Sequence, residues 1–231
     1  MDFKNNTSKY KSEINTSQRA IGKLIEFLDK YLPEFPALFK KKTANTNIKG
    51  EDAISEEVWE YLQSIAQHTR KIFMFQFQRK ERGSTRSSDF GVLIVKPFNI
   101  SPSKEFFRIE AKRLPTPGTD KDGNSREREY VQSDAGGIQR YKKGFHAPDL
   151  PQSAIIGYIQ KENCSHWHKK INEWIQQLIP IKKADIDWNA QDLLVHSADF
   201  STTQKYVSTN TRIVNSPPDS ILLWHYLMEL V

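Results

Sequence analysis

The chain has 231 residues, which is enough for one well-packed domain with a helical extension but cramped for two full domains. Its net charge of +6 suits a polyanionic partner, and its single cysteine, Cys164, excludes an intramolecular disulfide. No apolar run approaches membrane-spanning length, and the polar start, MDFKNNTSKYKSE, lacks the apolar core of a signal peptide. These features predict a cytoplasmic protein that does not enter a membrane.

The first predicted element is an amphipathic helix over residues 17–31. Apolar residues recur in it at near-helical spacing, at Ile21, Leu24, Ile25 and Leu28. Residues 1–15 show no such pattern and are expected to be irregular. We therefore predict an N-terminal helical extension over residues 1–45 and a main domain over residues 46–231.

A second helix is predicted from Gly50 onward. Its apolar stripe consists of Ile54, Val58, Leu62 and Ile65. Glu51 lies on the same stripe one turn earlier. A carboxylate in this place either complements the helix dipole or points inward as a ligand, and the sequence leaves both interpretations open.

Strands follow. Residues 71–78 are rich in aromatic side chains, and a basic, glycine-containing turn over residues 79–86 leads to Asp89. Two apolar runs come next, split by turn residues, and the second ends in Ile109-Glu110-Ala111-Lys112. This pattern predicts an antiparallel hairpin. Because side chains alternate along a strand, Glu110 and Lys112 point to one side, and the hairpin brings both of them close to Asp89 at the end of a sheet.

This group of side chains has a chemical use. Mg²⁺ prefers oxygen ligands and is commonly held at a phosphate by one or two carboxylates. A lysine beside them can orient or deprotonate a water, or offset phosphate charge. The competing interpretation is a solvated cross-strand pair, since an acidic-x-Lys triplet also occurs at Asp2-Phe-Lys4.

The rest of the chain predicts a long polar loop and further helices and strands. A helix closed by Gly144 is expected over residues 130–144, and His196 and His225 are expected to pack in the core. The other predicted elements are a buried strand at 153–160, a helix at 171–179 and strands at 193–196, 205–213 and 221–231. This order predicts an α/β fold with a mixed sheet flanked by helices.

Residues 50–160 resemble the PD-(D/E)xK nuclease superfamily. The resemblance is carried by Ser88-Asp89 before an apolar strand and by Ile109-Glu110-Ala111-Lys112 after it. Ser88 replaces the proline of the family's name, a position that the family keeps loosely. The resemblance implies a restriction-endonuclease-like fold and Mg²⁺ as the cofactor, with Mn²⁺ as a substitute.

The resemblance also implies roles for individual residues. Asp89 and Glu110 would hold the metal ion, the Ala111 carbonyl would complete its shell, and Lys112 would serve the attacking water. A glutamate from the helix before the first strand, Glu51 with Glu56 as the alternative, would assist. A helix over the active site would contribute a polar residue, with Gln139 and Arg140 as the candidates ahead of Tyr141. Phosphate contacts are expected from Arg86, Arg113, Arg140 and Lys142.

The expected function is therefore hydrolysis of DNA phosphodiester bonds by a metal-dependent nuclease. By analogy with the family we expect an endonuclease of bacterial defence or restriction that acts on double-stranded DNA with a partner protein or as a homodimer. The alternative is a catalytically inactive nuclease-like module that binds nucleic acid or a partner protein. An RNA-directed nuclease is a third option.

Overall fold

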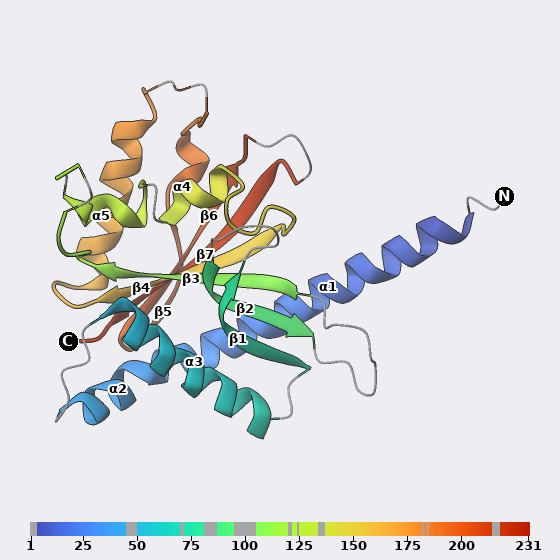
Figure 1. The fold of residues 1–231 in the computed structure, drawn as a ribbon, viewed down its shortest axis with the longest axis horizontal. Helices are drawn as coiled ribbons and strands as arrows, with labels where there is room; N and C mark the ends of the chain where they lie inside the picture. Colours follow the sequence, from blue (N-terminus) through green and yellow to red (C-terminus); the bar gives the residue numbers. More distant parts are fainter. Residues whose placement is uncertain are drawn as a thin grey trace.

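The structure is a computed structural model of the chain. It describes residues 4–44, 50–69, 72–80, 87–94, 105–119, 122–123, 125–133, 137–181, 183, 185–213 and 218–231. The fold is a seven-stranded mixed sheet flanked by helices, with helices at its N-terminus, as the sequence predicted (Figure 1). None of the described helices is both long and apolar enough to cross a membrane.

The sheet has the strand order β1-β2-β3-β4-β7-β6-β5. β3 and β4 pair in parallel, as do β4 and β7, and every other neighbouring pair is antiparallel. The strands are β1 (Phe73–Lys80), β2 (Ser87–Ile94), β3 (Glu105–Leu114), β4 (Gln152–Ile159), β5 (Val195–Phe200), β6 (Thr203–Thr211) and β7 (Ser220–Glu229). The predicted β2–β3 hairpin pairing and the predicted C-terminal strand are confirmed.

Three α-helices and a short 3₁₀ turn precede the sheet. They are α1 (Lys4–Tyr31), η1 (Leu32–Glu34), α2 (Phe35–Thr43) and α3 (Glu51–His68). The prediction of an irregular N-terminus is wrong for residues 4–15, because α1 begins at Lys4, and residues 1–3 lie outside the described residues. Leu24 and Leu28 of α1 and Leu62 of α3 are fully buried in one apolar cluster with the sheet.

The helices on the other face differ in length from the sequence prediction: α5 begins before the predicted residue 171, and the predicted helix over residues 130–144 is shorter. They are η2 (Arg126–Tyr130), α4 (Gly137–Lys142), α5 (Cys164–Leu178) and η3 (Ala190–Asp192). The prediction of a continuous helix over residues 130–144 is wrong, because η2 ends at Tyr130 and α4 begins only at Gly137. Gly137 has φ 61°, and a Cβ there would lie 1.9 Å from the Tyr130 carbonyl oxygen. Gly144, at φ 65°, follows the helix as predicted.

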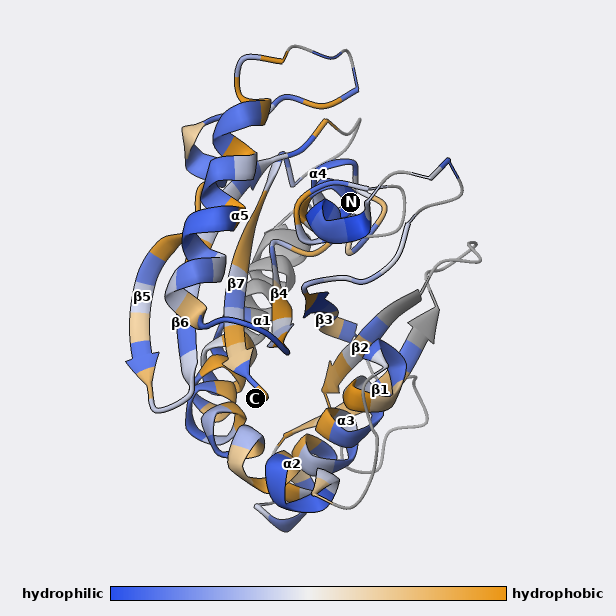
Figure 2. Cartoon of the chain, turned by 90° about the vertical axis from the view of Figure 1, so that its left-hand side faces the viewer, coloured by the Kyte–Doolittle hydropathy of each residue, from blue (hydrophilic) through white to orange (hydrophobic). Residues whose placement is uncertain are grey.

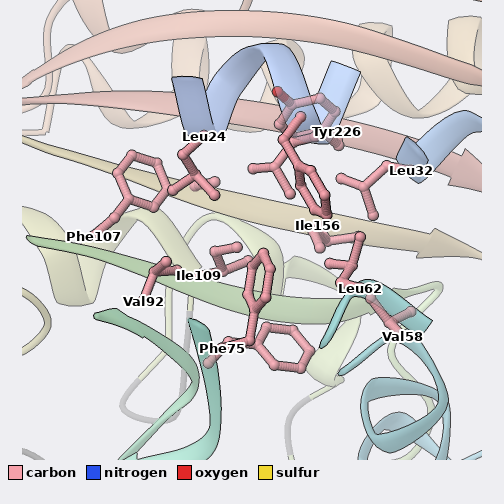
Figure 3. Close-up of a cluster of buried hydrophobic side chains, with 14 of the residues drawn as sticks. Leu24, Leu32, Val58, Leu62, Phe75, Val92, Phe107, Ile109, Ile156 and Tyr226 are labelled. Carbon is pink, nitrogen blue, oxygen red and sulfur yellow. The ribbon is translucent and has the colours of Figure 1, made fainter. Parts of the chain in front are cut away.

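The sheet separates two apolar cores. Ile156 of β4 packs with α1 and α3 (Figure 3), whereas Ile155 packs on the opposite side with α5, because neighbouring strand residues face opposite ways. In the side view, α5 lies along the β7 half of the sheet and α3 along β1, with β3 between them (Figure 2). Burial on both faces explains the continuous apolar run of β4.

Of the two histidines predicted to pack in the core, one is buried and the other is exposed. His225 is fully buried, with its ring nitrogens 3.0 Å from the Tyr130 hydroxyl and 2.9 Å from the Ser208 hydroxyl. His196 is exposed on the edge strand β5, 3.1 Å from Asp199, so its assignment to the core is wrong.

Candidate active site

The candidate site lies where β2 and β3 separate. Within the described residues, their pairing ends at Phe90 and Ile109. β2 nevertheless continues its pairing with β1 to Ser87, and β3 continues its pairing with β4 to Leu114. The two strands therefore diverge at the residues before Phe90 and after Ile109, which leaves an opening in the sheet.

Asp89 replaces the missing strand contact. Its Oδ2 accepts a hydrogen bond of 2.7 Å from the backbone N–H of Ala111, which has no β2 partner in the register. The N–H and C=O of one strand residue point to the same neighbouring strand. The Ala111 carbonyl is therefore directed toward the same opening as the Asp89 carboxylate.

Glu110 and Lys112 lie on the same face of β3, as the alternation predicted. Lys112 Nζ is 3.1 Å from Glu110 Oε1, and both side chains are almost fully buried. Ile109 and Ala111 face the opposite core with α1 and α3. The predicted meeting of Asp89, Glu110 and Lys112 is thus present at the end of β3.

Glu51 reaches the same place from the first turn of α3. Its Oε1 is 3.0 Å from Lys112 Nζ, and its Oε2 accepts a hydrogen bond of 2.9 Å from the Arg113 backbone N–H. Glu56, the alternative, is exposed on α3. Both Glu51 oxygens thus accept hydrogen bonds, and Glu51 orients Lys112 in this structure. Its role as a metal ligand stays a prediction.

Three carboxylates surround the Lys112 ammonium. Burial lowers the pKa of Lys112, but the negative charges of Glu110, Glu51 and Asp89 outweigh burial and raise it overall. Lys112 is therefore a protonated cation in the metal-free protein. Of the roles predicted for it, offsetting charge and orienting a water fit this state, and deprotonating a water stays a prediction.

Asp89 is pushed toward its protonated form. Burial of its carboxyl group and the neighbouring charge of Glu110 raise its pKa to about 8, against weaker opposing effects of Lys112 and the Ala111 N–H. The residue as a whole is half-buried, and its carboxyl group is directed at the Ala111 N–H of the neighbouring strand. The Asp89 carboxyl group therefore lies close enough to Glu110 for the charge of one to disfavour ionisation of the other.

A second group of side chains approaches Glu110 from beyond β3. Arg140 Nη1 of α4 is 3.8 Å from Glu110 Oε1, and His146 Nε2 is 3.5 Å from Glu110 Oε2. His146 was missed by the sequence analysis. Its only signal was a histidine in the turn-rich segment after the predicted helix, which does not reveal the strand that it faces.

The other residues predicted for the site differ in their positions. Gln139 is half-buried on α4, and among the described contacts Arg140, not Gln139, reaches Glu110. Lys142 is buried against Asp192 at 2.6 Å, so its predicted contact with nucleic acid is not available in this structure. Arg113 is half-buried beside the site, and Arg86 lies outside the described residues.

The carboxyl groups of Asp89 and Glu110 are the candidate ligands for a metal ion. In the described part of the chain, no three His, Cys, Asp or Glu side chains are arranged to hold one. Mg²⁺ requires only one or two carboxylates, with water and phosphate oxygens completing its shell. Glu110 Oε2 is buried without a hydrogen bond among the described residues, and Asp89 carries a raised pKa beside it. These two carboxyl groups offer hard oxygen donors, one of them with no hydrogen bond among the described residues, and such a donor set fits this cation.

Comparison of the chain with protein-family models, with curated proteins and with solved structures found no match.

Proposed function

We propose that the chain is a Mg²⁺-dependent nuclease that hydrolyses DNA phosphodiester bonds, with a restriction-endonuclease-like fold. The observation that carries this proposal is the convergence of Asp89, Glu110 and Lys112 where β2 and β3 separate. Asp89 is far from Glu110 and Lys112 along the chain, but the three side chains come together where the two strands separate. A purely structural sheet needs neither the opening nor this group of carboxyl side chains.

The side chains divide the work by their chemistry. Asp89, Glu110 and the Ala111 carbonyl would hold Mg²⁺, which when bound supplies Lewis-acid chemistry at the phosphate. The Lys112 ammonium, oriented by Glu51, stabilises negative charge on the reacting phosphate. Arg140, at the far side of Glu110, adds a second cation for the same phosphate.

The substrate follows from charge and from the resemblance. A chain with net charge +6 and with Arg113 and Arg140 beside the site suits a nucleic-acid backbone. The family resemblance favours double-stranded DNA, endonucleolytic cleavage and a place in bacterial defence or restriction, with a partner protein or as a homodimer.

The test is a cleavage assay on linear duplex, circular duplex and single-stranded DNA and on RNA, with Mg²⁺, Mn²⁺ or EDTA. Lys112→Met removes the charge at similar length, and Lys112→Arg keeps the charge but changes its position. Lys169→Ala is the control, since this lysine is 80% exposed on α5. We expect metal-dependent cutting of duplex DNA by the parent and the control, and loss of cutting in both Lys112 variants with folding preserved.

The alternative function gives a different result. A nuclease-like module that only binds would shift duplex DNA or a partner protein in a binding assay while cutting none of these substrates. Cutting that is unaffected by both Lys112 variants would contradict the proposed site. Cutting of RNA alone would keep the site and change the substrate.

A further inference from the structure

The two carboxylate oxygens of Glu110 have different surroundings, and Oε2 faces a histidine. Oε1 has Lys112 at 3.1 Å and Arg140 at 3.8 Å, whereas Oε2 is buried and accepts no hydrogen bond within the described residues. The nitrogen that faces Oε2 is His146 Nε2, at 3.5 Å, on a side chain with no exposed surface. A buried carboxylate oxygen requires a donor, and this imidazole stands just beyond hydrogen-bond distance.

The backbone around His146 is built to turn the imidazole inward. The residue after it, Ala147, is fully buried and has φ 48°, a left-handed conformation that a non-glycine residue adopts only under constraint. The Tyr141 ring packs against the imidazole, with 5.5 Å between the ring centres. His146 is therefore held in place by its own turn and by α4.

Arg212, just after β6, holds this turn through hydrogen bonds to its backbone. Its guanidinium donates to three backbone carbonyls, those of Ala147 at 2.6 Å, Pro148 at 3.0 Å and Tyr141 at 3.3 Å. A buried guanidinium that serves carbonyl groups ties together the start and the end of one loop. The segment so fixed runs from the end of α4 to Pro148 and carries His146 to Glu110.

We propose that His146 is a positioning residue of the nuclease site, whose Nε2–H donates to Glu110 Oε2 and thereby keeps Oε1 turned toward Lys112. This inference rests on the proposed function, because orienting Glu110 matters for a residue that holds a metal ion. Side chains that hydrogen-bond to metal-binding carboxylates fix their orientation, and losing one commonly weakens metal binding by about 10-fold to 100-fold.

The first experiment measures Mn²⁺ binding by electron paramagnetic resonance of the free ion, without DNA. We expect His146→Ala to bind Mn²⁺ about 10-fold more weakly than the parent. His146→Gln, whose amide places a donor near the position of Nε2, should bind within about 3-fold of the parent. His196→Ala, at the exposed histidine of β5, is the control, and thermal unfolding verifies that each variant is folded. Equal binding by the parent and a folded His146→Ala would overturn the inference.

The second experiment observes the contact itself. Two-dimensional ¹H–¹⁵N spectra of the histidine rings, assigned by the signal that His146→Ala removes, report which nitrogen carries the proton. We expect the proton on Nε2, and a proton on Nδ1 alone would overturn the inference whatever the metal does. A parent protein that binds no Mn²⁺ would overturn the proposed function and this role with it. Normal binding that His146→Ala leaves unchanged would overturn this role alone.

Discussion

Two buried lysines of this protein have opposite surroundings. Lys142 faces Asp192 at 2.6 Å, one cation with one anion, and both side chains are almost completely buried. Burial lowers the pKa of Lys142 more than Asp192 raises it. Lys112 is equally buried, yet the carboxylates of Glu110, Glu51 and Asp89 raise its pKa overall.

The difference separates a structural ion pair from the proposed active site. The Lys142 pair is balanced, and its loss would matter only for folding. The Lys112 ammonium is surrounded by three carboxyl groups, and ionisable groups with strongly shifted pKa values cluster at functional sites. The same residue type, at the same depth, therefore has oppositely shifted pKa values because of the number of its partners.

The largest expected effect is on the rate of DNA cleavage, which should depend on Lys112 and not on Lys142. Lys112→Met should reduce the rate of DNA cleavage by about 10³-fold, because it removes the cation nearest the carboxylates. The matched control is the double variant Lys142→Met/Asp192→Leu, which replaces the balanced pair by apolar side chains and should cleave like the parent. Rates at saturating Mg²⁺ and DNA measure both, and equal losses in the two variants would erase the distinction.

The next effect is on stability. Asp192→Ala should lower the free energy of unfolding by about 3–5 kcal/mol, because it leaves the Lys142 ammonium buried without its partner. Lys142→Met/Asp192→Leu should recover most of this loss, since no charge remains buried. Urea unfolding followed by circular dichroism measures both. If Asp192→Ala is as stable as the parent, the ion pair is not structural.

Asp89 should make stability depend on pH. Its pKa rises from its ordinary value of 3.8 to about 8 on folding, so folding takes up a proton between these values. The stabilisation from the protonated form is complete at low pH and is lost as the pH rises through about 8. Asp89→Asn, which cannot ionise, should therefore exceed the parent in stability at pH 9 by about 1–3 kcal/mol, and by less at pH 5.

This comparison is made in metal-free protein by urea unfolding at both pH values. Asp199→Asn, on the exposed edge strand β5, is the control and should show no such difference. A parent and an Asp89→Asn variant with the same pH dependence would mean that the Asp89 carboxyl is not held protonated.

The smallest expected effect concerns DNA affinity. Arg113→Gln should weaken binding to duplex DNA of any sequence and reduce the slope of log K against log salt by about 1, because one phosphate contact is lost. Lys169→Gln on α5 should leave the slope unchanged. Fluorescence anisotropy at several salt concentrations, with Ca²⁺ in place of Mg²⁺, measures the slopes. Identical slopes in all three proteins would place Arg113 away from the DNA.

The sequence by itself determined the local elements and the core of the site. The stripe through Val58 and Leu62 predicted α3, the continuous apolar run predicted β4, and the alternation in β3 placed Glu110 and Lys112 on one face. These predictions succeed because helix and strand periodicity, and the burial that follows from it, are written in neighbouring residues.

Only the tertiary structure decided which distant groups meet. The separation of β2 from β3, the approach of His146 to Glu110 and the burial of Lys142 against Asp192 all join segments that no local pattern relates. The end of η2 and the late start of α4 depend likewise on how Gly137 packs against Tyr130. Periodicity fixes which way a side chain points from its own element, but packing between elements decides what it finds there.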